Sequence, residues 1–262
     1  MNKVRANGID LHYRIEGQGP WIVMSHALAC DHRMWDAQAA QLAQRYTVLR
    51  YDTRGHGASD APPGPYSFDM LAADAAALFD ALGIERAHWL GLSMGGMIGQ
   101  AFALAYPQRV ASLVLADTSS RYPADVETVW AERIRTVRDQ GMEAVVSATL
   151  ERWFTKPFRD AHPEVMQRIG DTIRATPVEG YAGCGQAIAK LNFTEALRSL
   201  RCPTLVIVGD QDSGTPIEMA REIHEAIEGS RLAVIASAAH LSNIEQAEAF
   251  NGLVEDFYRA LD

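Results

Sequence analysis

The amino-acid sequence predicts an α/β fold: a mostly parallel sheet flanked by helices, with a helical cap inserted between two of the strands. Short apolar runs of strand length alternate with segments of helix length along most of the chain. This alternation is typical of parallel strands that are buried on both faces. The interval from 120 to 200 departs from it, because it shows helical periodicity and no convincing strand. We therefore expect a core formed by residues 1–119 and 201–262, and a cap formed by residues 120–200.

The composition is that of an ordinary globular protein and excludes several classes of function. The 262 residues are 48% hydrophobic and 22% charged, which is enough for a large buried core. A formal charge of −9 and scattered arginines argue against nucleic acid as a partner, since a polyanion would be repelled. With no signal peptide and no apolar run of membrane-spanning length, we expect a cytoplasmic protein that does not enter a membrane. Cys30, Cys184 and Cys202 are odd in number and widely spaced, which indicates small buried side chains and neither disulfides nor a zinc site.

The elements expected before the cap begin with a hairpin. Val4–Arg14 alternates in polarity around Asn7-Gly8, a dipeptide typical of a type I′ turn. Helices are expected at Phe68–Leu82 and Met94–Tyr106, between the apolar runs. The runs that we expect to be buried strands are Trp21–Ser25, Tyr46–Tyr51, His88–Leu90, Ser112–Ala116, Thr204–Val208 and Leu232–Ala236.

The cap is expected to contain at least three helices. Apolar residues from Val126 to Val137 share one helical face, and Gly141 follows as a stop. A second face runs from Val145 to Trp153 and stops near Pro157, and a third includes Val165, Ile169 and Ile173. In open α/β sheets, ligands bind beyond the carboxyl ends of the strands, so a cap placed there would roof a pocket.

The most informative motif is the sequence Gly-Leu-Ser-Met-Gly-Gly at residues 91–96. It follows an expected strand and opens an expected helix, which is the setting of a nucleophile elbow. In such a turn the small residues allow a sharp reversal, and the helix N-terminus points at developing negative charge. A glycine-rich packing turn is the alternative. The context favours Ser93 as a nucleophile.

A serine nucleophile needs a general base, and His240 is the best placed histidine. It lies in a loop just after the last expected strand and before the C-terminal helix. His26 and His56 are the rivals, but His26 ends an apolar strand and His56 lies in a glycine-rich loop, so both are expected to shape the backbone. We therefore predict that His240 accepts the proton of Ser93.

The carboxylate that orients the base has three candidates, each after an expected strand. Asp212 and Asp210 follow Thr204–Val208, and Asp117 follows Ser112–Ala116. We favour Asp212, with Asp117 and Asp210 left as alternatives. The chain order Ser…Asp…His is that of the α/β-hydrolase fold.

Two backbone N–H groups are needed to hold the oxyanion that forms when a carbonyl is attacked. The first is expected from Met94, immediately after the nucleophile. The second is expected from the loop after Trp21–Ser25, where Leu28 is the best candidate.

With these motifs in place, the chain resembles the 3-oxoadipate enol-lactonases of aromatic catabolism, the enzymes of the β-ketoadipate pathway. The resemblance covers nearly the whole chain and is most specific at residues 50–57, 91–96 and 239–245, with further likeness at 151–155 and 179–181. It implies hydrolysis of a small enol-lactone to 3-oxoadipate through an acyl-enzyme, with no cofactor and no metal. It also supports Asp212, because the family's acid stands just ahead of the short loop that is here Ser213–Pro216.

The implied substrate carries a free carboxylate, which a cationic group in the cap should receive. Arg152 is the preferred candidate because of its family-like surroundings, with Trp153 beside it as a pocket wall. The other candidates are Arg133, Arg135 and Lys190. One departure bears on the substrate, because Ala29-Cys30 stands where the family usually has Gly-Thr in the oxyanion loop.

Two other functions are consistent with the same residues. Another small-molecule carboxylesterase or lactonase would use the same three side chains on a different ester, since the fold alone does not determine the substrate. A hydrolase-fold binding protein that has lost turnover is disfavoured by the intact serine, histidine and aspartate.

Overall fold

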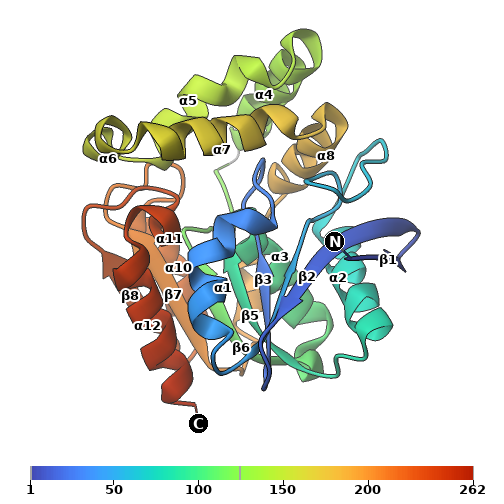
Figure 1. The fold of residues 1–262 in the computed structure, drawn as a ribbon, viewed down its shortest axis with the longest axis vertical. Helices are drawn as coiled ribbons and strands as arrows, with labels where there is room; N and C mark the ends of the chain where they lie inside the picture. Colours follow the sequence, from blue (N-terminus) through green and yellow to red (C-terminus); the bar gives the residue numbers. More distant parts are fainter. Residues whose placement is uncertain (1, 124, 262) are drawn as a thin grey trace.

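The computed structural model describes residues 2–123 and 125–261, and it confirms the α/β-hydrolase fold (Figure 1). The sheet has the strand order β1-β2-β4-β3-β5-β6-β7-β8. Strand β2 pairs antiparallel with both β1 and β4, and all later pairs are parallel. The strands are β1 (Asn2–Ala6), β2 (Ile9–Glu16), β3 (Trp21–Ser25), β4 (Thr47–Tyr51), β5 (Ala87–Leu92), β6 (Val110–Ala116), β7 (Thr204–Gly209) and β8 (Arg231–Ile235).

The predicted hairpin and the predicted strands are confirmed, but the expectation that the last strand is buried is wrong. Strand β8 lies at the edge of the sheet, and Val234 in it is 49% exposed. Asn7 and Gly8 both have positive φ, 47° and 80°, as a type I′ turn between β1 and β2 requires. Strands β3 and β7 are almost wholly buried, in agreement with their unbroken apolar sequences. The ends of the other strands differ from the predicted runs by only a few residues.

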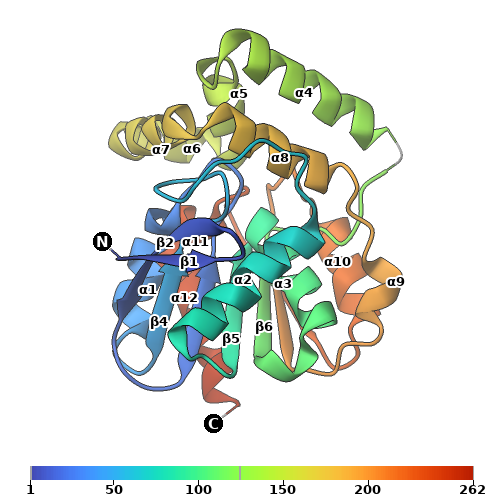
Figure 2. The ribbon, with the colours of Figure 1, turned by 90° about the vertical axis from the view of Figure 1, so that its right-hand side faces the viewer.

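Helices cover both faces of the sheet (Figure 2). Helices α2 (Phe68–Leu82) and α3 (Met94–Ala105) pack together on one face. Helices α1 (Asp36–Leu42) and α12 (Ala247–Arg259) pack together on the opposite face. Helix α2 begins at the Ser67 side chain, which accepts the Met70 N–H. The other helices outside the layer described next are the 3₁₀ helices η1 (His32–Trp35) and η2 (Pro107–Arg109), with α9 (Thr194–Leu197), α10 (Ile217–Ala226) and α11 (Ser242–Glu245).

A layer of helices lies between β6 and β7 in the chain and covers the end of the sheet where the parallel strands terminate (Figure 1). Its members are α4 (Val126–Gln140), α5 (Glu143–Trp153), α6 (Lys156–Ala161), α7 (Pro163–Ala175) and α8 (Val178–Ile188). Gly141 ends α4 as predicted. Pro157 does not end α5, which stops at Trp153; it lies in the first turn of α6, where a proline fits because no intrahelical donor is needed.

Helix α8 has no counterpart among the predicted helices, and its glycines explain why. Gly180, Gly183 and Gly185 each lower its intrinsic helix propensity. A Cβ atom on Gly180 would lie 1.9 Å from the Gly55 oxygen, and one on Gly183 would lie 2.7 Å from the Tyr66 ring. These glycines therefore allow α8 to pack closely on the core. Within the described part of the chain, no helix has the length and apolarity needed to span a bilayer.

Candidate active site

The turn that carries Ser93 joins β5 to α3 and is conformationally strained. Ser93 has φ 55° and ψ −118°, a region that residues other than glycine rarely occupy. A Cβ atom on Gly91 would lie 2.2 Å from the Gly95 oxygen, and one on Gly95 would lie 1.9 Å from the Ser25 oxygen. Glycine is thus required at both positions, because no side chain fits where the turn crosses β3. The motif and its strained serine match the description of a nucleophile elbow.

The structure brings together three of the predicted side chains from three different strand ends. The Ser93 hydroxyl lies 2.9 Å from His240 Nε2, and His240 Nδ1 lies 2.8 Å from Asp212 Oδ2. Ser93 follows β5, Asp212 follows β7 and His240 follows β8. All three are buried, yet Ser93 and His240 line a cavity. A hydroxyl, an imidazole and a carboxylate in this series can act as nucleophile, general base and orienting acid.

Asp212 is fixed by hydrogen bonds on both carboxylate oxygens. Oδ1 accepts the Gly214 and Thr215 N–H groups at 2.8 and 3.0 Å, and Oδ2 accepts the Thr215 hydroxyl at 2.6 Å. Burial alone would raise the pKa of Asp212, but attraction to His240 and these hydrogen bonds hold it below its usual value. The carboxylate is therefore ionised where His240 needs it. Neither alternative acid contacts the imidazole: Asp210 is exposed, and Asp117 bonds elsewhere.

His240 has a base strength set by two opposing effects. Burial alone would lower its pKa, but the charge and hydrogen bond of Asp212 outweigh this and raise it above the ordinary value. Trp153 from α5 lies over the ring, with centroids 6.3 Å apart and an interplanar angle of 29°. The imidazole is thus oriented by Asp212 and covered by the cap.

The rival histidines shape loops. His26 Nδ1 bonds the Ala27 oxygen at 2.7 Å, and its Nε2 accepts the Thr53 N–H at 2.9 Å. His56 Nε2 accepts the Ala29 N–H at 3.0 Å. Burial lowers the pKa of both rings, that of His56 to about 3, so both are neutral hydrogen-bonding groups. Neither contacts Ser93.

The two predicted oxyanion donors are Met94, which follows the serine in the chain, and Leu28, which lines the same cavity as the serine. Met94 is the first residue of α3, where N–H groups have no intrahelical acceptor. In the loop after β3, the Ala27 N–H contacts Met34 Sδ and the Ala29 N–H contacts His56. Among the hydrogen bonds of residues 2–123 and 125–261, none uses the Leu28 N–H. Leu28 and Ser93 line the same cavity, so this N–H is available to a ligand there.

The cavity lies between the cap and the core, with a volume of about 250 Å³. Of the predicted substrate-binding residues, Arg152 and Trp153 both line it, together with Arg133, which was an alternative. Arg135 and Lys190 do not; they line a larger outer groove between α4 and α8. The remaining cavity walls are mostly apolar or aromatic, formed by residues such as Met97, Tyr122, Val126, Trp130, Tyr181 and Ile188.

The two cavity arginines lack acidic partners. Within the described residues, neither Arg133 nor Arg152 forms an ion pair. Arg152 makes a 3.3 Å bond to the Thr149 hydroxyl, and Arg133 lies over the Trp130 ring at 5.1 Å. Burial, followed by repulsion from Arg133, lowers the pKa of Arg152. Two unpaired cations next to an imidazole give the cavity an affinity for anions.

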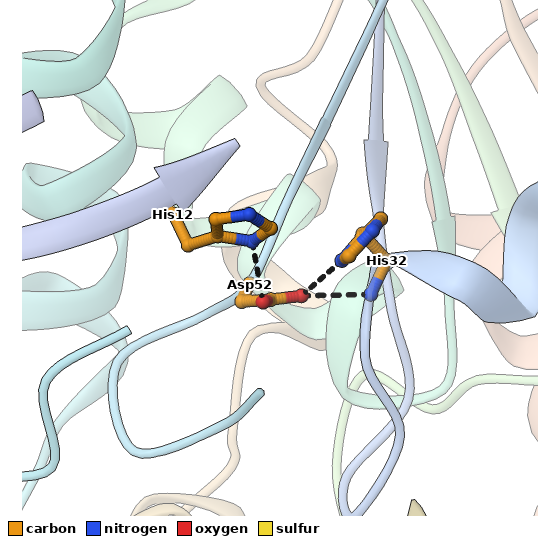
Figure 3. A group of neighbouring side chains, drawn as sticks. All are labelled: His12, His32 and Asp52. Carbon is orange, nitrogen blue, oxygen red and sulfur yellow. Dashed lines mark hydrogen bonds and ion pairs between the residues drawn. The ribbon is translucent and has the colours of Figure 1, made fainter. Parts of the chain in front are cut away.

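One other cluster has the composition of a metal site. His12 from β2, His32 from η1 and Asp52, directly after β4, lie close together (Figure 3). Asp52 Oδ1 accepts the backbone and ring N–H groups of His32, and Oδ2 accepts the His12 ring and the Ala58 N–H, all at 2.8–2.9 Å. Each carboxylate oxygen already has two donors. The cluster is therefore explained as a hydrogen-bond network that fixes this loop.

Comparison with known proteins identifies the family. The family model for the alpha/beta hydrolase fold matches residues 20–247. The chain is 37% identical over 252 residues to 3-oxoadipate enol-lactonase 2 of Acinetobacter baylyi, covering 95% of this chain and 93% of that protein. The chain belongs to the 3-oxoadipate enol-lactonase family of α/β hydrolases. This confirms the resemblance seen in the sequence.

Solved structures agree with the assignment. The enol-lactonase from Burkholderia xenovorans LB400 superposes with a TM-score of 0.95 at 40% identity, covering 98% of this chain and 100% of that one. A thermophilic esterase from Thermogutta terrifontis, solved with malate bound, has a TM-score of 0.95 at 31% identity and covers 100% and 99%. The chain is thus a hydrolase of the ester and lactone type.

Several residues of this family member were not singled out from the sequence. Tyr122 and Tyr181 line the cavity, and Glu245 joins the cap to the core by accepting the N–H and hydroxyl of Thr155. Arg133 could have been preferred, because it lies three residues after Trp130 and therefore on the same side of α4. Tyr181 lies in the family-like segment 179–181, but its position among the glycines of α8 gives no indication that its side chain lines the cavity.

Proposed function

We propose that this enzyme hydrolyses a small enol-lactone bearing a free carboxylate, 3-oxoadipate enol-lactone, through an acyl-enzyme on Ser93. The observation that carries the proposal is the unbroken hydrogen-bond series from Ser93 through His240 to Asp212 beneath a cavity with two unpaired arginines. Relatives that bear the name 3-oxoadipate enol-lactonase support this substrate. In aromatic catabolism such a reaction yields 3-oxoadipate.

The reaction would proceed in two steps. His240 Nε2 takes the hydroxyl proton as Ser93 Oγ bonds to the lactone carbonyl carbon, and the N–H groups of Met94 and Leu28 receive the oxyanion. The ring C–O bond then breaks and the enol oxygen leaves as an enolate, which the imidazolium protonates. Water loses a proton to His240 as it attacks the acyl carbon. The bond between the acyl carbon and Ser93 Oγ then breaks, and the imidazolium returns its proton to Ser93 Oγ as the diacid is released. Asp212 stabilises the imidazolium in both steps.

The cavity arginines would select the substrate. A carboxylate placed between Arg133 and Arg152 would pair with cations that are already partly desolvated, so little reorganisation is needed. The apolar walls would hold the lactone ring against Ser93. Substrates without the carboxylate would leave the arginines unpaired and bind less well.

The test is steady-state hydrolysis of 3-oxoadipate enol-lactone beside a neutral aryl acetate. Ser93→Ala should lower kcat by about 10⁶-fold on both substrates, as in a serine enzyme that loses its nucleophile; retention of a tenth of the activity would refute the role of Ser93. Arg133→Ala should lower kcat/KM on the enol-lactone by about 10- to 100-fold, the effect of losing a charged hydrogen bond, and leave the aryl acetate nearly unchanged. Arg135→Ala, on the same helix but outside the cavity, is the matched control.

A second candidate is a carboxylesterase of the same mechanism acting on a different small acid ester. The likeness to a thermophilic esterase solved with malate bound favours it. Of the Ala29-Cys30 pair in the oxyanion loop, Ala29 lines the cavity, where a residue other than the family's glycine would change the shape of the site. Aryl acetate hydrolysis without activity on the enol-lactone would select this candidate.

A further inference from the structure

The short segment that follows β6 contacts every loop that carries a residue of the proposed triad. The Ala116 carbonyl oxygen accepts the Ser93 N–H at 2.9 Å, and the Thr118 hydroxyl donates to the backbone carbonyl oxygen of Ser93 at 2.7 Å. Between them, Asp117 accepts the Gly209 N–H on Oδ1 at 2.8 Å and the Ser242 hydroxyl on Oδ2. The segment thus bonds to the turn after β5, the end of β7 and the start of α11.

These bonds lie close to the reacting groups in the chain. Gly209 ends β7 and accepts the N–H of Asp212 at 3.2 Å. Ser242 comes directly after Leu241, the residue next to His240. In the sheet order, β6 and β7 separate β5 from β8, so Ser93 and His240 arise from strands about 14 Å apart. The 2.9 Å distance between Ser93 Oγ and His240 Nε2 therefore requires contacts that hold the loops after β7 and β8 in a fixed position relative to the turn that carries Ser93.

Asp117 is unusual in its burial, its backbone conformation and its electrostatic surroundings. It is fully buried and has φ 43°, a conformation that costs free energy for residues other than glycine. No cation pairs with it among the described residues. The titratable groups that act on it are Asp212, after β7, and His240, after β8. Burial, and then repulsion from Asp212, raises the pKa of Asp117 to about 8.

An uncharged acid at this point has a chemical advantage. With the carboxyl protonated, Oδ1 still accepts the Gly209 N–H, and the contact with Ser242 is kept with the acid O–H donating to the Ser242 oxygen. Both contacts are then made without a second negative charge beside His240, where such a charge would raise the pKa of the base further. A base with a higher pKa is more fully protonated at neutral pH and less available. The uncharged group can therefore align the loops, while the negative charge that acts on His240 is that of Asp212.

We propose that Asp117 is a positioning residue, whose carboxyl group holds the loops that carry Asp212 and His240 in register with the Ser93 turn. The inference rests on the proposed function of Ser93, Asp212 and His240. It assigns Asp117 no contact with substrate, so its loss should change kcat and leave KM largely unaffected.

The experiment compares Asp117→Ala and Asp117→Asn by steady-state hydrolysis of an aryl acetate and by the rate at which a fluorophosphonate labels Ser93. Asp117→Ala should lower both kcat and the labelling rate by at least tenfold, as expected for a misplaced base, with KM within about threefold. Asp117→Asn keeps an acceptor for the Gly209 N–H and an N–H donor for the Ser242 oxygen, as the protonated carboxyl does, so kcat should stay within about threefold of wild type. Asp210→Ala removes an exposed acid from the loop that carries Asp212 and is the matched control.

A folded Asp117→Ala enzyme with kcat within twofold of wild type would overturn the proposal, and so would an Asp117→Asn enzyme as impaired as the alanine variant. Should Asp117→Ala fail to fold, Ser242→Ala removes one of the two bonds, and a wild-type kcat in that variant would have the same consequence. Failure of the wild-type enzyme to be labelled at Ser93 would overturn the proposed function and this inference with it. Labelling that is insensitive to Asp117 would overturn the inference alone.

Discussion

The raised pKa of Asp117 predicts a measurable change in stability when this residue becomes asparagine. The carboxyl group has a pKa of about 8 in the folded protein and an ordinary value of 3.8 when exposed. Between these values the unfolded chain has lost the proton and the folded protein keeps it. Because the folded pKa is the higher one, the favourable contribution of this group is complete below about pH 4 and declines as pH rises toward 8.

The magnitude follows from the single proton involved. A difference of one bound proton changes the free energy of unfolding by about 1.4 kcal/mol per pH unit. An asparagine side chain does not titrate, so Asp117→Asn should gain stability relative to wild type with this slope. From pH 4 to pH 7 the relative gain is at most about 4 kcal/mol. Full burial means that solvent screening does not reduce the effect.

The assay is urea unfolding of both proteins between pH 4 and pH 8, followed by tryptophan fluorescence and circular dichroism. Asp210→Asn, at an exposed position of the same end of the sheet, should differ from wild type by a constant amount. A free-energy difference between Asp117→Asn and wild type that does not change with pH would refute the reasoning. A wild type that gains relative stability with rising pH would show that Asp117 is ionised and favourably paired.

Three further predictions follow from the site. Because Asp212 raises the pKa of His240, the kcat/KM of the wild-type enzyme should fall as pH decreases through a midpoint above 6.5. In a pH–rate profile, Asp212→Asn should move this midpoint to lower pH and decrease kcat by about 10⁴-fold. A wild-type rate that is unchanged down to pH 4 would contradict this. Glu245→Ala should lower the free energy of unfolding by about 2–4 kcal/mol in urea, because the bonds to Thr155 are lost, whereas an unchanged midpoint would show that they contribute nothing. Gly95→Ala should abolish activity or folding, because its Cβ atom would lie 1.9 Å from a backbone oxygen of β3; a soluble, fully active variant would contradict the crowding.

The core could be predicted because its central parallel strands are buried on both faces and are therefore apolar along their whole length. Apolar runs such as Thr204–Val208 have no amphipathic alternative, and Asn7-Gly8 specifies a turn by its backbone preferences alone. The turn at Ser93 was recognisable for the same reason, since its glycines answer a local steric demand. Structural features that depend only on residues close together in the chain can therefore be predicted from the sequence.

The cap could be predicted less well because its structure depends on contacts with distant residues. Helix α8 contains glycines that local propensity would exclude, and they are present because the core backbone and the Tyr66 ring come so close. Whether an arginine of α4 enters the cavity depends on how that helix docks. Arg133 lines the cavity and Arg135 the outer groove, although they are two residues apart.

The choice among the acids shows what a sequence leaves open at the site itself. Asp117, Asp210 and Asp212 all follow strands that end at the same edge of the sheet, so proximity to His240 is expected of each. The structure separates them by their hydrogen bonds: Asp212 contacts the imidazole, Asp210 faces solvent, and Asp117 bonds the end of β7 and the start of α11. Asp117, which the sequence offers as an alternative to Asp212, thus has in the structure the contacts of the positioning residue that we propose. A buried carboxyl group in a strained conformation, without a cation, is costly for folding, and its position between the triad loops supplies a reason for retaining it.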